Sequence, residues 1–369
     1  MKKSRIKQRA IQLIPIIGCI IFIFLSCDLI MDTKSNGMIW YNEDLEDFVI
    51  YAFSPGFGTL AMIELESGTV HHPVPEIESI QSVVTNEEGT KLYVSTAEGH
   101  AGVNPGKIYE INTSNWESRV IYENSVHLLS NRTGGIYFIT KLDSGTKRIF
   151  GTIDPTSGSV SELDTINVVW GAEYDDDLIE IHPYQPIVYA ISDSGGELYS
   201  YNYNIKEKIS IFPELPFPPL ANIILSGGGD SLYIPGGPVL DLIREEIVGS
   251  IPVWRLGRAA SRRDNKEVYI TDPGGYLREP YPSGKVYIYS PERDQIVGDI
   301  TVKEEGWRTT DRIYLTTRER YAVVSDWLFH FYVIDLKNRK VIRTHEYLVN
   351  GERTHSVQSF YLSFRPPVL

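Results

Sequence analysis

The stretch Leu92-Tyr93-Val94-Ser95 is a short apolar run around a tyrosine that ends in a hydroxyl side chain. Runs of this kind recur along the chain, and their aromatic and β-branched residues favour strands over helices. The seven runs are Val49-Ile50-Tyr51-Ala52, Leu92-Tyr93-Val94-Ser95, Ile136-Tyr137-Phe138-Ile139-Thr140, Val188-Tyr189-Ala190-Ile191-Ser192, Leu232-Tyr233-Ile234, Val268-Tyr269-Ile270-Thr271 and Ala322-Val323-Val324-Ser325.

The spacing of these runs is that of a repeat. Their central positions are Tyr51, Tyr93, Tyr137, Tyr189, Tyr233, Tyr269 and Val323. The steps between them average about 45 residues, which is the period of a four-stranded propeller blade. No helical periodicity of any length interrupts the series. The sequence therefore predicts an all-β fold, a seven-bladed β-propeller of four-stranded blades over residues 47–369.

The units resemble the YVTN-type propeller repeat, in which a Tyr-Val strand is followed by a Val-Ile-Asp strand and a closing Ile-Pro-Val-Gly. The best matches are Leu92-Tyr93-Val94, Val333-Ile334-Asp335 and Ile251-Pro252-Val253-Trp254. The resemblance covers about residues 47 to 365. It implies a fold but no particular activity, because such repeats occur in proteins with quite different activities.

The C-terminal run from Ser356 to Pro366 resembles the innermost strand that precedes each repeat tyrosine, such as Ile80 to Thr85. Propellers avoid unpaired sheet edges. We therefore expect Val357 to Phe364 to complete the N-terminal blade, whose other strands come from about Phe48 to Val74. The alternative is a frayed C-terminal tail.

The N-terminal segment 1–26 differs from the rest of the chain. A basic segment without acids precedes the apolar stretch Ala10 to Leu25, which has the length of a signal sequence and is short for a membrane span. Phe24-Leu25-Ser26-Cys27 then resembles a lipobox, although Phe24 stands where Leu is usual. We expect a lipoprotein signal peptide over 1–26, acylation (palmitate) at Cys27 and a flexible tether over 27–46. The alternative is an uncleaved N-terminal anchor helix with Cys27 incidental.

Either interpretation places the domain outside the cytoplasm, at a bacterial cell envelope and attached to a membrane. Asp28 resembles an inner-membrane retention signal of some bacteria, and the choice of membrane stays open.

The only cysteines are Cys19 and Cys27, so the mature domain has no disulfide and no thiolate metal site. The net charge of the whole chain is −13, or near −18 without the five signal cations, which argues against a nucleic-acid partner. We expect a monomer.

Ligands of propellers usually meet the junction loops, which join the outer strand of one blade to the inner strand of the next at one end of the channel. Three such junctions carry a tryptophan, at Trp170, Trp254 and Trp307. Arginines near them belong to neighbouring blades and would hold a carboxylate, a phosphate or an acidic surface through bidentate contacts. The alternative is a structural role in pairing with acids and packing on the next blade. The predicted ligand-binding residues are Trp254, Arg255, Arg258, Trp307, Arg308, Arg312, Arg353 and His355.

The sequence predicts no metal site, no cofactor and no catalytic residue. The acidic run Glu173 to Asp177, with Glu180, lacks the spacing of a calcium loop. Adjacent His71 and His72 would point to opposite faces of a strand. There is no Gly-x-Ser-x-Gly elbow and no phosphate-binding loop before a helix, and Gly227 to Asp230 reads as a turn between strands.

Two functions remain open at this point. The first is a cell-envelope lipoprotein whose propeller is a binding or scaffold module for a protein or glycan partner. Loops over Ala97–Gly106 and Asp272–Gly284, rich in Gly, Pro and Tyr, favour recognition. The alternative is a propeller enzyme, such as a lactonase-like hydrolase or a lyase, with its site at the channel mouth.

Overall fold

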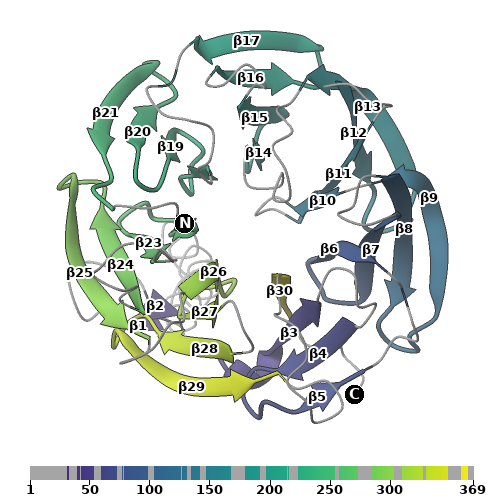
Figure 1. Cartoon of the computed structure of the whole chain (residues 1–369), viewed down its shortest axis with the longest axis horizontal. Coiled ribbons are helices and arrows are strands. Elements are labelled where there is room, and N and C mark those ends of the chain that lie inside the picture. Colours follow the sequence, from purple (N-terminus) through teal and green to yellow (C-terminus); the bar gives the residue numbers. More distant parts are fainter. Residues whose placement is uncertain are drawn as a thin grey trace, which may run out of the picture.

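The computed structural model is a ring of seven blades around a central axis, each a four-stranded antiparallel sheet (Figure 1). The seven-bladed all-β propeller predicted from the repeat is confirmed. The structure describes residues 31–32, 40–41, 43–53, 60–72, 77, 79–98, 104–125, 127–130, 134–141, 147–167, 179–191, 197–213, 215, 223–253, 257–272, 284–302, 310–326, 330–347 and 359–364.

Six blades use four consecutive strands each, in order from the axis outward. Blade two has β6 (Ile80–Thr85), β7 (Lys91–Glu98), β8 (Asn104–Asn112) and β9 (Ser118–Ser125); blade three has β10 (His127–Ser130), β11 (Ile136–Lys141), β12 (Lys147–Ile153) and β13 (Val160–Asn167); blade four has β14 (Ile179–Ile181), β15 (Ile187–Ile191), β16 (Leu198–Asn202) and β17 (Glu207–Phe212). Blade five has β18 (Ile224–Leu225), β19 (Ser231–Tyr233), β20 (Pro238–Asp241) and β21 (Glu246–Ser250); blade six has β22 (Ala259–Ser261), β23 (Val268–Thr271), β24 (Lys285–Ser290) and β25 (Gln295–Thr301); blade seven has β26 (Thr310–Leu315), β27 (Tyr321–Asp326), β28 (His330–Asp335) and β29 (Lys340–Glu346).

Blade one joins the two ends of the chain. It consists of β30 (Ser359–Phe364), β3 (Phe48–Phe53), β4 (Leu60–Glu64) and β5 (Val70–His71). β30 pairs with β3 from Phe364 opposite Phe48 to Ser359 opposite Phe53. The predicted closure of the ring by the C-terminal strand is therefore confirmed.

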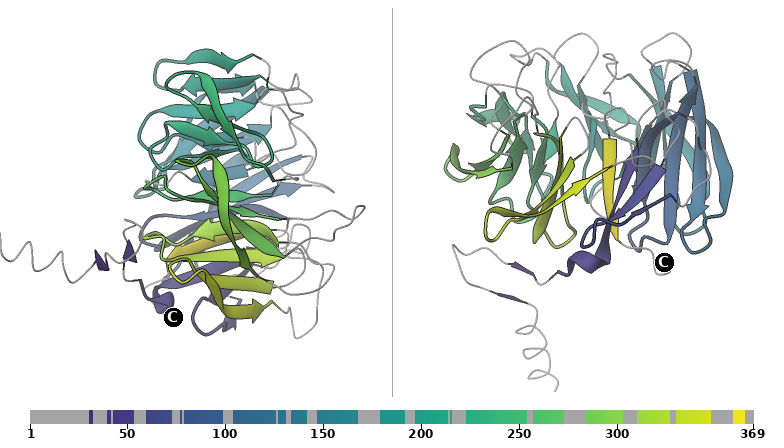
Figure 2. Two further views of the ribbon diagram at one scale, coloured as in Figure 1. Left: turned by 90° about the vertical axis from the view of Figure 1, so that its left-hand side faces the viewer. Right: turned by 60° about the horizontal axis from the view of Figure 1, so that its bottom comes forward.

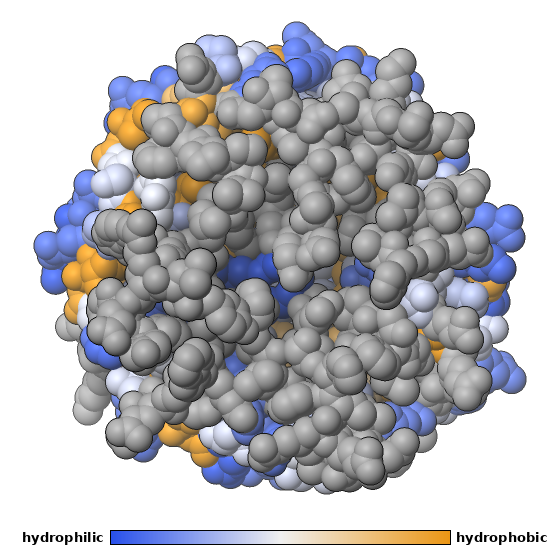
Figure 3. Space-filling view, in the orientation of Figure 1, coloured by the Kyte–Doolittle hydropathy of each residue, from blue (hydrophilic) through white to orange (hydrophobic). Residues whose placement is uncertain are grey.

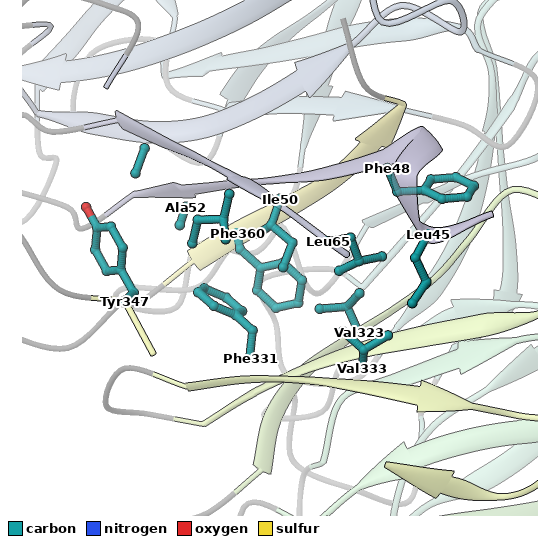
Figure 4. Packing of buried hydrophobic residues seen from close by; sticks show 12 residues of the cluster. Leu45, Phe48, Ile50, Ala52, Leu65, Val323, Phe331, Val333, Tyr347 and Phe360 are labelled. Carbon is teal, nitrogen blue, oxygen red and sulfur yellow. The ribbon is translucent and has the colours of Figure 1, made fainter. Parts of the chain in front are cut away.

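β30 also holds three other blades in place. The ring of Phe360, which is 2% exposed, packs edge-on against Phe331 of blade seven with centroids 5.2 Å apart (Figure 4). On the other side, Ser363 Oγ lies 2.6 Å from Thr85 Oγ1 of blade two. The hydroxyl of Tyr361 lies 3.3 Å from Ser130 Oγ of blade three.

The core is divided among the blade interfaces instead of filling one centre. Each of the seven buried apolar clusters combines residues of two neighbouring blades. The cluster between blades seven and one, for example, brings Val323 and Phe331 against Ile50 and Phe360. A blade whose neighbour is missing would expose one apolar face to water.

The repeat tyrosine lies on the second strand of its blade, and in blades two, three and five its hydroxyl bonds to the next blade. Tyr93 donates to the carbonyl of Pro155 in blade three at 3.3 Å and to Glu110 Oε2 at 3.2 Å. Tyr233 donates to Asn265 Oδ1 in blade six at 2.5 Å. Tyrosine recurs because its ring fills the interface between blades while its hydroxyl fixes their relative position.

The Ser or Thr that ends several repeats fixes the start of the inner strand. Thr271 Oγ1 accepts the N–H of Arg258 at 2.9 Å, and Ser325 Oγ accepts the N–H of Arg312 at 3.3 Å. In blade two, Ser95 Oγ lies 2.6 Å from Ser82 Oγ, which in turn accepts the N–H of Leu128 at 2.6 Å. These hydroxyls satisfy backbone groups where the ladder ends.

The up-and-down order of the strands gives the ring two different faces. The turns from first to second strand and from third to fourth strand share one face, which we call the turn face. The junction loops and the connections from second to third strand share the other, the junction face. The junction face is toward the viewer in Figure 1, and the two faces are seen from the side in Figure 2.

The chain enters the ring at the turn face. The carboxylate of Glu43 accepts the backbone N–H groups of Arg318 at 2.6 Å and Arg320 at 2.9 Å, in the first turn of blade seven. Leu45 in the short 3₁₀ helix η1 (Leu45–Asp47) is 6% exposed and packs in the cluster with Phe48. Contacts with the ring thus begin before residue 47, inside the segment expected to be a flexible tether.

Before Glu43, the strands β1 (Met31–Asp32) and β2 (Trp40–Tyr41) pair with each other and lie on the turn-face side of the ring (Figure 2). No helix in the described part of the chain is long and apolar enough to cross a membrane. The expected signal peptide and Cys27 lie outside the described residues.

Removing residues 355–369 deletes β30 and should unfold the whole domain. Loss of Phe360 and the other β30 side chains alone costs about 3–5 kcal/mol per large side chain, against a total stability of about 5–15 kcal/mol. Circular dichroism should show loss of the cooperative thermal transition. A chain shortened only by residues 365–369 keeps β30 and serves as control. Equal melting temperatures for both truncations would contradict closure through β30.

The hydroxyls of Tyr51 and Tyr93 should contribute differently to stability. Both side chains are 0% exposed, and burial raises the pKa of each phenol, so both stay protonated. Among the described residues the Tyr51 hydroxyl has no hydrogen-bond partner, whereas Tyr93 binds Glu110 and Pro155. Tyr93→Phe should lower the free energy of unfolding by about 1–2 kcal/mol, and Tyr51→Phe should leave it unchanged or raise it. Urea denaturation measures both, and a larger loss for Tyr51→Phe would contradict the assignment.

Candidate binding site at the central channel

The channel along the ring axis contains a cavity of about 420 Å³ whose wall includes residues of all seven inner strands. The wall is about equally polar and apolar, and its apolar side chains include Val84, Ile224 and Ile313. Six ionisable side chains interrupt it: Glu87, Glu180, Arg258, Arg263, Arg312 and Glu319. Figure 3 shows hydrophilic residues at the centre of the junction face.

The register of the blades assigns each wall residue to a level along the axis. In each blade, one residue of the inner strand pairs with the central residue of the repeat run, such as Val84 with Tyr93. These seven inner-strand residues form one level: Val84, Leu129, Glu180, Ile224, Ala260, Tyr314 and Tyr361. Of these described residues, Glu180 of β14 alone is charged, and it is partly buried. A carboxylate therefore lies midway along an otherwise apolar part of the channel.

Two arginines lie at one level nearer the junction face. Arg258 stands opposite Thr271 and Arg312 opposite Ser325, each two positions before its blade's residue at the Glu180 level. At about 3.3 Å per residue, the arginine level is roughly 7 Å from Glu180 along the strands. Arg258 directly precedes β22 and Arg312 lies within β26; these are neighbouring inner strands, and Arg312 is only 7% exposed.

The turn-face end of the channel has both signs of charge. Glu319, 7% exposed, accepts the backbone N–H of Arg263 with Oε1 at 2.7 Å. Glu87 lies nearby in the first turn of blade two. Among the described wall residues, the turn-face end thus combines Arg263 with carboxylates, while the charged residues at the junction-face level are both arginines.

Of the eight predicted ligand-binding residues, the structure describes two, Arg258 and Arg312, and it brings them to one level of neighbouring blades. The other six lie outside the described residues: Trp254, Arg255, Trp307, Arg308, Arg353 and His355. The acidic run Glu173–Asp177 and Trp170 also lie outside them.

Other features expected from the sequence are described in part. His71 Nε2 lies 3.2 Å from Glu64 Oε1, and His72 is exposed. Gly227–Asp230 forms the first turn of blade five, as predicted. The expected loop Ala97–Gly106 is shorter than predicted, because β7 and β8 remain paired at Ala97 with Pro105. Within the described residues, no group of three or more His, Cys, Asp or Glu side chains could hold a metal ion.

Sequence reasoning missed the channel position of Glu180 and treated it only as part of an acidic loop. Its signal was present, since Glu180 immediately precedes Ile181 in the segment that leads into the repeat at Tyr189. Aligning that segment with Val83–Val84 before Tyr93 would have placed the carboxylate in the inner strand.

No family model matches the chain, and no curated protein matches it in sequence. Solved structures do match it. The dihydro-heme d1 dehydrogenase NirN in complex with DHE is 12% identical, with a TM-score of 0.51 over 87% of this chain and 76% of that chain. The β-propeller domain of Myceliophteria thermophila Cps50 (Swd1) is 13% identical, with a TM-score of 0.53 over 74% of this chain and 89% of that chain.

This likeness shows the fold. At such low identity it does not extend to function, and the two similar structures differ in what their names describe. The function has to be argued from the channel itself.

Proposed function

We propose that this protein is a lipid-anchored cell-envelope protein whose propeller binds a protein or glycan partner at the junction-face end of its channel. The observation that carries the proposal is the pair Arg258 and Arg312 at one level of neighbouring blades, beside a 420 Å³ cavity. Guanidinium groups hold carboxylates through paired, charge-assisted hydrogen bonds. The acidic groups of the partner are the part that this end of the channel would bind.

The surroundings of the two arginines support a binding role. The backbone N–H groups of both arginines donate to the hydroxyls of Thr271 and Ser325, so the arginine side chains project from a fixed backbone. The domain as a whole is acidic. A local cationic level in an acidic domain favours a ligand that brings its carboxylate to this place, because repulsion elsewhere disfavours other orientations.

Replacing both arginines should weaken binding of acidic probes. Each charge-assisted hydrogen bond contributes about 1.5–3 kcal/mol, so we expect Arg258→Gln with Arg312→Gln to bind at least about tenfold more weakly. Calorimetric titration of the full chain with a glutamate-rich peptide and with a uronic-acid oligosaccharide measures the effect and distinguishes the two partner classes.

The matched control is Arg244→Gln with Arg293→Gln, which removes the same charge from exposed turns of blades five and six. If both double variants weakened binding of the acidic probes equally, the loss of net charge alone would explain the effect. Unchanged binding by the channel pair, in a protein that still melts cooperatively, would rule out this end of the channel as the site.

The anchor and the repeat type belong to the same proposal. The basic segment, the apolar stretch and the lipobox-like Phe24-Leu25-Ser26-Cys27 support cleavage before Cys27 and acylation of its thiol. The Tyr-Val and Val-Ile-Asp strands support blades of the YVTN type. Entry of the chain at the turn face, through Glu43, is compatible with an anchor that leaves the junction face open.

Cys27→Ala should abolish incorporation of an alkyne-tagged fatty acid and leave residues 1–26 on the protein. Cys19→Ala is the matched control, because Cys19 is the only other cysteine and lies inside the expected signal peptide. It should keep the label and the mass of the cleaved, acylated chain. Intact-mass spectrometry of a wild-type chain that retains residues 1–26 would support the uncleaved helix and contradict the lipid anchor.

A further inference from the structure

Exposed apolar side chains are concentrated in one sector of the ring. The described residues include seven large hydrophobic side chains that are well exposed, and six of them belong to blades four and five. The exception is Val120 in blade two, at 43% exposure. The six, which we call the apolar sector, are Tyr184, Ile205, Ile209, Ile243, Ile247 and Val248.

The apolar sector faces the turn side of the ring. Tyr184 lies in the first turn of blade four, and Ile205 and Ile243 lie in the last turns of blades four and five, with exposures of 68%, 65% and 78%. All three turns are on the turn face. Ile209 and Ile247 are near the beginnings of β17 and β21, where these outer strands leave the same face. The sector is thus a corner where the turn face meets the outer rim.

The charges around this corner nearly cancel. Lys206, Lys208 and Arg244 stand against five carboxylates, a net charge of −2, and Lys208 Nζ lies 3.2 Å from Glu197 Oε2. The other four carboxylates are Glu207, Asp241, Glu245 and Glu246. Arg244 lies 3.7 Å from Asp241 and 3.6 Å from Glu246. Apolar side chains with a tyrosine and a nearly neutral border fit the interface of a zwitterionic bilayer, where aromatic rings lie at the headgroups and basic chains extend outward.

The position of the chain's entry favours the bilayer over other occupants. Glu43 attaches the N-terminal segment to the turn face at blade seven. Blade four lies across the ring from there, with two blades between on one side. The segment from Cys27 to Glu43 would span roughly 55 Å if fully extended, and the pairing of Met31 with Tyr41 shortens this reach. An anchor at Cys27 therefore keeps the turn face close to the membrane.

We propose that the apolar sector rests on the membrane surface, so that the ring lies with its turn face on the bilayer and its junction face toward the envelope space. This rests on the proposed lipid anchor. Ile205 and Ile243 insert at the headgroup boundary, where apolar faces of peripheral proteins are buried by about 5–10 Å. Blade seven, held through Glu43, and the apolar sector are then two supports on opposite sides of one face.

The test uses single cysteines at exposed positions of the full, acylated chain. Ile205→Cys, Ile243→Cys and the control Thr301→Cys, an exposed residue at the junction-face end of β25, each carry an environment-sensitive fluorophore, and the proteins are reconstituted in phosphatidylcholine vesicles. With brominated phosphatidylcholine, the labels at 205 and 243 should lose their emission and the label at 301 should keep it. A label at Tyr184→Cys should also be quenched, and it should regain emission when Ile205→Ser and Ile243→Ser are added.

Three results would overturn the proposal. Labels at 205 and 243 that keep their emission in a chain that floats with vesicles would exclude the contact and leave the anchor intact. Equal quenching at position 301 would exclude a preferred face. Emission changes that depend on protein concentration without vesicles would assign the sector to a second copy. Failure of the lipid anchor is recognised separately, because the unmodified Cys27 of the wild-type chain would then take the fluorophore.

Discussion

The pairing of β30 with β3 is the constraint on which the rest of this structure depends. Every buried cluster is shared by two neighbouring blades, so no blade can cover both of its apolar faces alone. Blade one needs a strand from the far end of the chain to become a full sheet. Because β30 also contacts blades two, three and seven, its absence would open the interfaces on both sides of blade one.

The repeat could be predicted from sequence because one residue type serves the same purpose in most blades. Tyr93 and Tyr233 each fill an interface and bind the following blade, so spacing and residue type recur together. The capture of Glu43 by blade seven had no such signal. Its segment is polar and reads as a tether, and its partners are turn amides near the opposite end of the chain.

The site could be predicted only in part, for a related reason. The position of Arg258 and Arg312 beside the junctions is visible in the sequence, but their common level depends on the exact pairing of Ala259 with Ile270 and of Ile313 with Val324. The depth of Glu180 depends on register in the same way. Register is fixed by packing over the whole blade, which a local pattern does not contain.

Polar residues of the turn face hold the backbone of their own turns. On the turn face, the residue after the inner strand often holds its own turn: Asn86 Oδ1 accepts the N–H of Lys91 at 2.9 Å, and Ser226 Oγ accepts that of Ser231 at 3.1 Å. His182 Nδ1 accepts two N–H groups at 3.0 Å, and burial lowers the pKa of this imidazole, which keeps the accepting nitrogen unprotonated. Polar side chains of these turns stabilise the fold.

The place of β30 in the chain also sets the order in which the molecule can be completed during synthesis. Phe48 is made early, and its partner Phe364 is made only after every other blade. A ribosome produces the N-terminus first, so blade one waits with an open inner edge while all the others are made. Until β30 has emerged from the ribosome, the inner strand of blade one is missing and the ring cannot close.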